Sequence, residues 1–278
     1  MIDSIKRFII NGIKNFFHIC GYSIFISKRT KPYNSCNEKK IRINIGSGDW
    51  KCDGWTNLDY PTKWYAGSQS HHKFIPFDIR KDNLPFKNES IDLIYSSHVI
   101  EHIENEHIDK LFRECYRVLK CGGGGRLCCP DAEFLYEATK ANKQYWTWRD
   151  SWFSNTRYCN GKTIPKEIDK LVTEIATPKF QSYKGAIRSN FDYANHFKQN
   201  DMNSFFSELT KDLSFRPNWP GDHINWWTFD KIHEMLQKAG FRTIIRSKFG
   251  GSIFDDMKDI TKFDTTEPQM SLYVDFIK

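Results

Sequence analysis

The stretch IRINIGSGD, residues 41–49, decides the fold. Its isoleucines form a short apolar run that is typical of a buried strand, and the run stops at Gly46 and Gly48. Because glycine lacks a Cβ, a glycine-rich turn lets the backbone approach a ligand closely and adopt unusual dihedral angles. We therefore predict a ligand site directly after this strand.

The rest of the chain alternates strand-like and helix-like segments. Strands are predicted at 56–59, 72–78, 91–97, 126–130, 242–249 and 271–278, and helices at 98–119 and 227–241. The run CGGGG (121–125) is expected to end the first helix, and Gly240 the second. Such alternation indicates a doubly wound α/β sheet, whose ligands bind beyond the carboxyl ends of its strands.

Acidic residues end the two strands that follow the glycine turn. Asp59 could accept both hydroxyls of a ribose, as in adenosine-containing cofactors, or could simply be a turn aspartate. Asp78 could accept from an adenine amino group while Ile79 packs on the ring. The dinucleotide fingerprint requires a third glycine three residues after Gly48, where this chain has Lys51, so nicotinamide and flavin cofactors are disfavoured.

Taken together, these motifs resemble those of class I S-adenosylmethionine-dependent methyltransferases of the type 11-like group. The resemblance runs through INIGSGD (43–49), NLD (57–59), FDIRKDNLPFKNESIDLIYSSHVIEHI (77–103), RECYRVLKCGGGGRLCCPD (113–131), AGF (239–241) and SLYVDFIK (271–278). It is strongest to enzymes of bacterial surface-polysaccharide (capsule) gene clusters, in which a short link replaces the first helix. Here only ten residues separate Gly48 from Asp59.

The resemblance implies a Rossmann-like, seven-stranded, mostly parallel sheet with an antiparallel last strand at 271–278. It also implies S-adenosylmethionine as cofactor, held by the glycine turn and three strand ends. The residues implied are Gly46, Ser47, Gly48, Asp59, Asp78, Ile79, Ser96 and Ser97.

Three parts are expected along the chain. Residues 1–40 form a basic helical arm, 41–130 and 223–278 the cofactor-binding core, and 131–222 a mainly helical insertion that serves as an acceptor lid. The arm holds most of the net charge of +7, so it could attract an anionic membrane, an acidic partner or RNA. The rest of the chain is almost neutral, so this charge does not make it a nucleic-acid binder. Its segment 5–26 is interpreted as a helix that caps the core, with an interfacial membrane helix as the alternative.

The cysteines and the aromatic residues give further indications about the kind of site and the compartment. The eight cysteines contain no C-x-x-C pair, which argues against a zinc ribbon and a redox dithiol and favours reduced thiols in the cytoplasm. The aromatic residues Tyr145, Trp146, Trp148, Trp152 and Phe153 could stack on sugars, but the core of the insertion is the favoured interpretation.

Histidines are the candidates for proton transfer. His98, Glu101 and His102 stand at i, i+3 and i+4, which predicts one shared helical face at the mouth of the strand 91–97. A histidine of near-neutral pKa can take a proton from an attacking hydroxyl, and His223 is expected to reach the same opening. Glu101 and His102 could instead be a helix-packing pair.

No metal site is predicted. Some small-RNA 2′-O-methyltransferases hold magnesium through E-x-x-E-H and a later histidine, but here His98 stands in the place of the first glutamate. Histidine suits magnesium poorly, so the similarity is discounted.

The sequence therefore predicts a cytoplasmic methyltransferase that acts on an oxygen of a sugar or a phosphorylated or phosphoramidate precursor. An acceptor that is already anionic would need no general base. An RNA methyltransferase, supported only by the basic arm, and a cofactor-binding scaffold without turnover are the alternatives.

Overall fold

The computed structural model describes residues 40–71, 73–141, 144–154, 166–180 and 193–278. All of the predicted basic arm except Lys40, including the segment 5–26, lies outside these residues. Within the described part, no helix is both long enough and apolar enough to cross a membrane.

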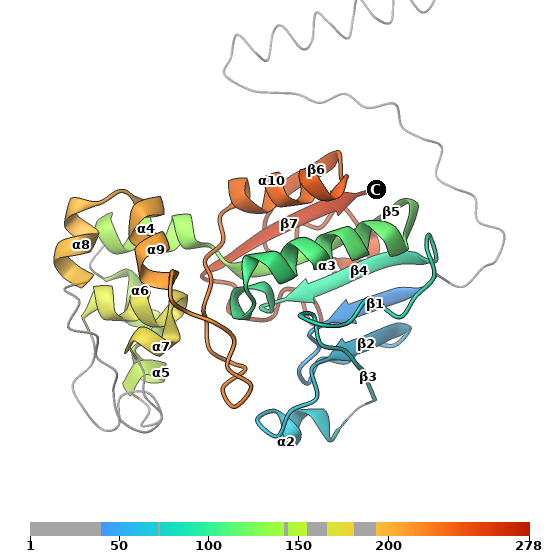
Figure 1. Ribbon diagram of the computed structural model, residues 1–278, viewed down its shortest axis with the longest axis horizontal. Coiled ribbons are helices and arrows are strands. Elements are labelled where there is room, and N and C mark those ends of the chain that lie inside the picture. Colours follow the sequence, from blue (N-terminus) through green and yellow to red (C-terminus); the bar gives the residue numbers. More distant parts are fainter. Residues whose placement is uncertain (1–39, 72, 142–143, 155–165, 181–192) are drawn as a thin grey trace, which may run out of the picture. The chain divides into compact units, whose positions relative to one another are not determined.

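Seven strands form one sheet in the order β3-β2-β1-β4-β5-β7-β6 (Figure 1). They are β1 (Arg42–Ile45), β2 (Trp55–Asp59), β3 (Ile75–Pro76), β4 (Ile91–Ser97), β5 (Leu119–Pro130), β6 (Thr243–Ser247) and β7 (Ser271–Ile277). Strand β7 runs antiparallel to both of its neighbours, β5 and β6, and the other neighbouring pairs are parallel. The predicted Rossmann-like sheet with an antiparallel last strand is confirmed, although β3 is much shorter than the expected 72–78.

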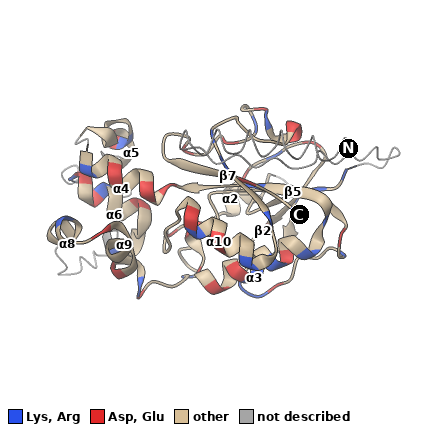
Figure 2. Cartoon of the chain, turned by 90° about the horizontal axis from the view of Figure 1, so that it is seen from above, with Lys and Arg blue, Asp and Glu red and all other residues tan. Residues whose placement is uncertain are grey.

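Most helices of the described residues lie between β5 and β6 in the sequence. They are α2 (Ala66–Gln69), α3 (Asn105–Val118), α4 (Ala132–Ala141), α5 (Asp150–Ser154), α6 (Glu167–Ile175), α7 (Thr177–Phe180), α8 (Tyr193–Gln199), α9 (Met202–Thr210) and α10 (Phe229–Ala239), with 3-10 turns η1 (Ile100–His102), η2 (Tyr145–Arg149) and η3 (Asp255–Met257). The two longest that cover the sheet, α3 and α10, lie against each other (Figure 1). Figure 2 shows acidic and basic residues interspersed along them, as expected for helices with one solvated side.

Two boundaries predicted around the first helix are wrong. The helix begins at Asn105 rather than His98, because His98 has a φ of 54° and is followed by the turn η1. The glycine run does not form a turn after the helix but belongs to β5. A Cβ at Gly124 would lie 2.2 Å from the carbonyl oxygen of Phe276, so the close approach of β7 requires glycine there.

An aromatic cluster takes the place of the first helix of the fold. Residues 46–54 form turns, as the short link predicted. Trp50, Trp55 and Tyr95 pack with Phe263 at centroid distances of 5.0–6.4 Å, joining the link to the loop before β7. This cluster covers part of the sheet that a helix would otherwise bury.

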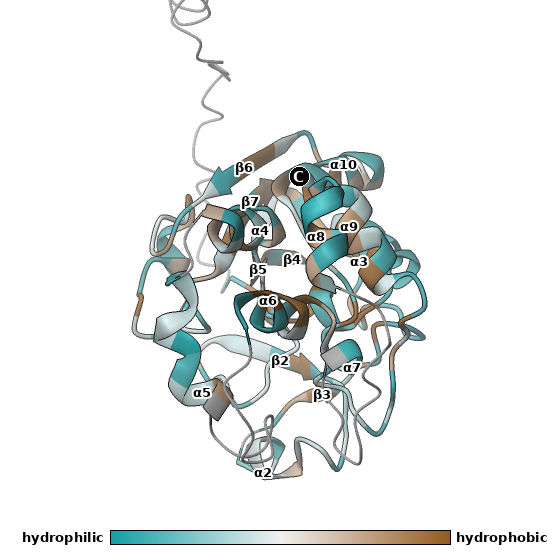
Figure 3. Cartoon of the chain, turned by 90° about the vertical axis from the view of Figure 1, so that its left-hand side faces the viewer, coloured by the Kyte–Doolittle hydropathy of each residue, from teal (hydrophilic) through white to brown (hydrophobic). Residues whose placement is uncertain are grey.

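Helices α4–α9 lie within the segment predicted as an insertion and have a hydrophobic cluster of their own. Trp146 and Phe153 are fully buried there, and Tyr145, Trp148 and Trp152 pack against the cluster, which confirms the core interpretation of these aromatic residues. Figure 3 shows hydrophilic and hydrophobic residues together on α6, α8 and α9. The chain leaves the sheet at Asp131 and returns beside it at Trp227, where the two residues form a parallel bridge.

Candidate active site

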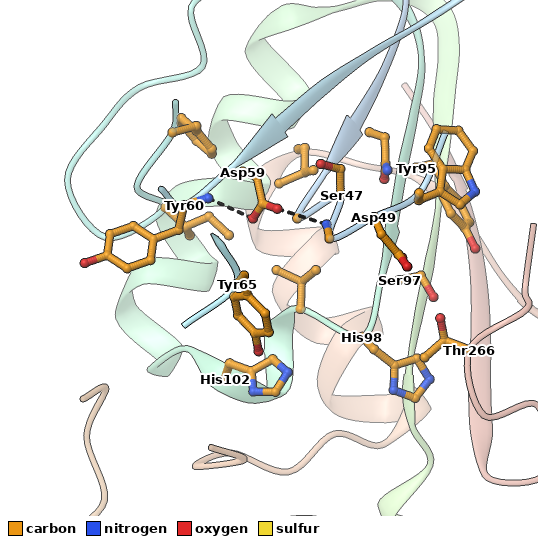
Figure 4. A pocket seen from close by; sticks show the side chains of 18 of the residues that line it. Ser47, Asp49, Asp59, Tyr60, Tyr65, Tyr95, Ser97, His98, His102 and Thr266 are labelled. Carbon is orange, nitrogen blue, oxygen red and sulfur yellow. Dashed lines mark hydrogen bonds between the residues drawn. The ribbon is translucent and has the colours of Figure 1, made fainter. Parts of the chain in front are cut away.

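A cavity of about 510 Å³ opens at the carboxyl ends of β1, β2 and β4. Seven of the eight residues predicted to bind the cofactor line it, and several of them are drawn in Figure 4. They are Gly46, Ser47, Gly48, Asp59, Asp78, Ile79 and Ser97. The strand-end placement expected for a doubly wound sheet is therefore observed.

The glycine turn and Asp59 form one hydrogen-bonded unit. The Gly48 N–H donates to Asp59 Oδ2 at 2.9 Å, and the Tyr60 N–H donates to Oδ1 at 2.8 Å (Figure 4). Gly46 and Gly48 have φ values of 73° and 54°, a region that favours glycine. A carboxylate oxygen can accept more than one hydrogen bond, so Asp59 can also accept from a ligand in the cavity.

Asp78 is held in place by Arg80. The guanidinium donates to both carboxylate oxygens, from Nε at 2.9 Å and from Nη2 at 2.7 Å. Burial opposes the charge on Asp78, but the hydrogen bonds from Arg80 lower its pKa below the usual value. Arg80 also lies over the ring of Phe215, 3.8 Å from its centroid, so the position of this carboxylate depends on a distant part of the chain.

Ser96 is not part of the cavity. Its hydroxyl is buried and donates to the Ile45 carbonyl at 3.0 Å, whereas Ser97 lines the cavity. Successive side chains of a strand point to opposite faces of the sheet, so two adjacent serines could not both face the ligand. The prediction for Ser96 is wrong for this reason.

Sequence reasoning missed one wall of the cavity. Phe215 and Pro220 line it from the segment that leads back from the helices. The Phe215 N–H donates to Glu104 Oε1 at 2.7 Å, and Trp219 packs on Trp64 with ring centroids 5.0 Å apart. Tyr60 and Tyr65 also line the cavity, and Thr266 lines it beside Ser97 and His98 (Figure 4). The segment has no hydrophobic period, and only its aromatic residues could have signalled the contact.

His98 lines the cavity with both ring nitrogens engaged. Its Nδ1 pairs with Glu101 Oε1 at 3.1 Å, and its Nε2 lies 2.8 Å from Ser271 Oγ. Burial opposes the charge on Glu101, yet its contact with His98 and the nearby histidines keeps its pKa well below the usual range. The two residues therefore meet as predicted, but in a turn rather than on a helical face.

His102 also lines the cavity, on the same side as His98 (Figure 4). Its Nδ1 lies 2.9 Å from the Asp222 carbonyl oxygen. Burial lowers the pKa of His102 to about 4, and the neighbouring His223 adds to this effect against the attraction of Glu101. His102 is consequently a weak base at neutral pH.

His223 does not line the cavity, so the prediction that it reaches the opening needs correction. Its Nδ1 lies 2.5 Å from the Glu174 carbonyl oxygen, and its ring lies against His102 with centroids 4.8 Å apart. These contacts hold His223 next to His102, and burial lowers its pKa. The structure thus brings all the predicted histidines into one cluster with Glu101.

Comparison with known protein families finds one match. Residues 55–127 match the family model described as a methyltransferase domain. No curated protein sequence matches the chain. The matched residues run from β2 into β5 and include Asp59, Asp78 and His98.

Solved structures similar to the chain include three described as methyltransferases. A S-adenosylmethionine-dependent enzyme of Thermotoga maritima, a possible histamine N-methyltransferase, has 13% identity over 86% of this chain and 82% of its own, with a TM-score of 0.41. One from Mesorhizobium loti has 16% identity over 86% and 90%, with a TM-score of 0.41. One from Archaeoglobus fulgidus has 10% identity over 86% of both chains, with a TM-score of 0.42.

Proposed function

We propose that this chain, an S-adenosylmethionine-dependent methyltransferase by its matched domain, methylates an oxygen of a small sugar or phosphorylated precursor of a surface polysaccharide. The domain at 55–127 supports the reaction. The acceptor class is suggested by the sequence motifs that resemble those of capsule-cluster enzymes. The cavity of about 510 Å³ falls within the size range of small-molecule sites, which is roughly 300–1,000 Å³.

The cavity fits S-adenosylmethionine at its glycine turn. A Cβ placed on Gly48 would meet no protein atom within 4 Å, so the turn leaves open space beside the backbone. Asp59, fixed by two backbone N–H groups, would bind the ribose hydroxyls, and Asp78 with Ile79 would hold the adenine. When bound, S-adenosylmethionine supplies an electrophilic methyl group on its sulfonium sulfur.

The residues of this chain act mainly by alignment. In Figure 4, His98 and His102 lie along one edge of the cavity, and Asp59 lies along the other. Cofactor and acceptor would be held between these two edges, and such positioning alone can contribute several kcal/mol, roughly 7–11 in favourable cases. The wall formed by Phe215 and Pro220 limits access from one side.

The hydrogen bonds and the pKa of the two cavity histidines indicate which kind of acceptor the site suits. His98 has both nitrogens engaged, and the pKa of His102 is lowered to about 4 by burial. Neither is well suited to remove a proton from a neutral hydroxyl. An oxygen that is already anionic, as in a phosphate or phosphoramidate, needs no base and suits this site best.

The test is a transfer assay with S-adenosylmethionine that carries a radiolabelled methyl group. Sugar phosphates, nucleotide sugars and phosphoramidates are offered in one set of reactions, and RNA in another. We expect label in a phosphorylated small molecule, because its anionic oxygen attacks without a base.

Two aspartate variants test the cofactor site, one at Asp59 and a matched control at Asp53. Asp59→Ala should weaken binding of S-adenosylhomocysteine by roughly 1.5–3 kcal/mol, the range for a hydrogen bond to a charged group. Asp53→Ala removes an exposed carboxylate from the same link and should bind normally. Label in RNA alone, or unchanged binding by Asp59→Ala, would contradict the proposal.

A further inference from the structure

Three possible metal ligands meet beside the cavity. Glu101, His102 and His223 each offer a ligand atom, and these atoms all lie within 4.8 Å of one another. Glu101 and His102 belong to η1, whereas His223 comes from the far end of the chain segment that contains the helices. Chain folding therefore assembles a set of two imidazoles and one carboxylate that is not contiguous in sequence.

Both imidazoles are oriented as metal-binding histidines usually are. Nδ1 of His102 faces the Asp222 carbonyl, and Nδ1 of His223 faces the Glu174 carbonyl. Because a carbonyl only accepts, each Nδ1 carries the proton, and each neutral ring keeps its lone pair on Nε2. A backbone carbonyl that fixes the second nitrogen in this way is the common outer partner of a metal-bound histidine.

Glu101 is a buried carboxylate whose one close side-chain partner among the described residues is His98. Its side chain is 1% exposed, and within the described residues neither of its oxygens accepts a hydrogen bond of good geometry. The nearest imidazole nitrogens are His98 Nδ1 at 3.1 Å and His102 Nε2 at 4.0 Å from its Oε1. A buried carboxylate with so few partners is costly, and a bound cation would compensate its charge.

We propose that Glu101, His102 and His223 bind one divalent transition-metal ion, such as zinc, manganese or iron(II), beside the cavity. Two histidines and one carboxylate are a common ligand set for these ions and leave coordination positions open. The same chemistry disfavours magnesium, which prefers oxygen ligands. His98 would then hold Glu101 from outside the ligand set.

The geometry requires only a small contraction. Metal–ligand distances of about 2.0–2.2 Å place ligand atoms roughly 3–3.5 Å apart. The ligand atoms now lie up to 4.8 Å apart, so small changes of side-chain conformation would bring them to these distances. His102 lines the cavity, so an open position of the ion lies within reach of an acceptor oxygen.

The catalytic role of the ion rests on the proposed function, whereas the binding itself does not. Next to the cavity, the ion would hold an anionic acceptor oxygen against the methyl donor or lower the pKa of an acceptor hydroxyl. It would also tie η1 to α6, since His223 is anchored on Glu174.

The test is metal titration of the full chain after treatment with a chelator, with neither cofactor nor acceptor present. Cobalt(II) reports its ligands through its visible absorption, and zinc(II) is then added as a competitor. We expect one equivalent per chain, no competition by magnesium, and no thiolate-to-cobalt band, because no cysteine is in the ligand set.

Two variants remove different ligands, so that a folding defect in one leaves the other informative. His223→Ala and Glu101→Gln should each lose at least about tenfold in affinity, the lower range seen even for outer-shell changes. His71→Ala, which removes an exposed histidine, should bind as the wild type does. Circular dichroism checks folding.

Three results would overturn the inference: no binding by the wild type at equimolar metal, wild-type affinity in both variants, or a cobalt spectrum of thiolate ligands. Methyl transfer by a chain that binds no metal would overturn the inference and leave the proposed function standing. Metal binding with the expected variant pattern supports the inference even where no offered acceptor is methylated.

Discussion

Gly46 and Gly48 differ in what surrounds their missing side chains. A Cβ on Gly46 would lie 2.2 Å from Val99 Cγ2, whereas one on Gly48 would meet open space. Both have positive φ, which costs a non-glycine residue about 1–2 kcal/mol. We expect Gly46→Ala to lower the free energy of unfolding well beyond this, and Gly48→Ala to stay near it, as measured by urea denaturation.

The two substitutions should also differ in their effect on ligand binding. Gly48→Ala places a methyl group into the space beside the turn and should weaken binding of S-adenosylhomocysteine in a folded protein. Equal stability losses in the two variants would contradict the close contact at Gly46. Undiminished binding by Gly48→Ala would remove the turn from the cofactor site.

At the scale of residues, the sequence identified strand-end groups better than groups fixed by distant contacts. Asp59 follows directly from its strand and the glycine turn, and it lines the cavity. His223 could not be placed, because its position depends on the Glu174 carbonyl in another helix. Ser96 lies outside the cavity because its side chain points to the opposite face of the sheet from that of Ser97.

Among the elements, helix α10 was the most predictable. Thr228 accepts from the Lys231 N–H at 3.2 Å at its start, and Gly240 ends it with a φ of 113°. By contrast, Val99, Ile100 and Ile103 continue the apolar spacing of α3 through a 3-10 turn, so periodicity alone set its start too early. Local caps identify a helix end where apolar spacing does not.

The first turn of α10 carries a partly buried lysine whose ionisation should affect stability. Burial lowers the pKa of Lys231 to about 7 from its usual 10.5. Between these values the unfolded chain holds a proton that the folded chain has lost, so the free energy of unfolding should rise with pH. We expect a contribution of up to about 1.4 kcal/mol per pH unit, measured by urea denaturation from pH 7 to 10.

Two substitutions isolate this contribution. Lys231→Met should remove it, and Lys238→Met, on the exposed side of the same helix, should retain it. An identical pH dependence in the wild type and Lys231→Met would mean that the ammonium stays charged. Its contacts with the Asn225 side chain and the Trp226 carbonyl would then outweigh its burial.

Across the whole described molecule, one buried arginine joins three segments. Arg126 in β5 donates to Asp264 at 2.8 and 2.7 Å and to Asp275 of β7 at 2.9 Å, and all three side chains are fully buried. Arg126→Met would leave two buried carboxylates without their cation. We expect a loss of about 3–5 kcal/mol in the free energy of unfolding.

An exposed ion pair provides the comparison. Arg113→Met breaks the pair with Asp109 on the surface of α3 and should cost less than about 1 kcal/mol. Denaturation by urea measures both variants. Similar small losses would show that Asp264 and Asp275 find other partners or are protonated.

The sheet was predictable as a whole, while the cavity was predictable only in part. Strand ends and the glycine turn follow from local sequence, and they define the cofactor side. The opposite wall depends on where the segment after α9 packs, as in the contact of Phe215 with Arg80. Such packing is a long-range effect that no local pattern encodes.

The bridge between Asp131 and Trp227 means that the chain departs from the sheet and rejoins it at neighbouring points. The Ala132 N–H donates to the Trp227 carbonyl at 2.9 Å, which ties the two points together. A different stretch of chain could be spliced between them without reordering any strand. Phe215, Pro220 and His223 all belong to the stretch that would be exchanged. Related chains could therefore acquire new acceptors by exchange of this one segment, provided that the new segment again supports Arg80, as Phe215 does here.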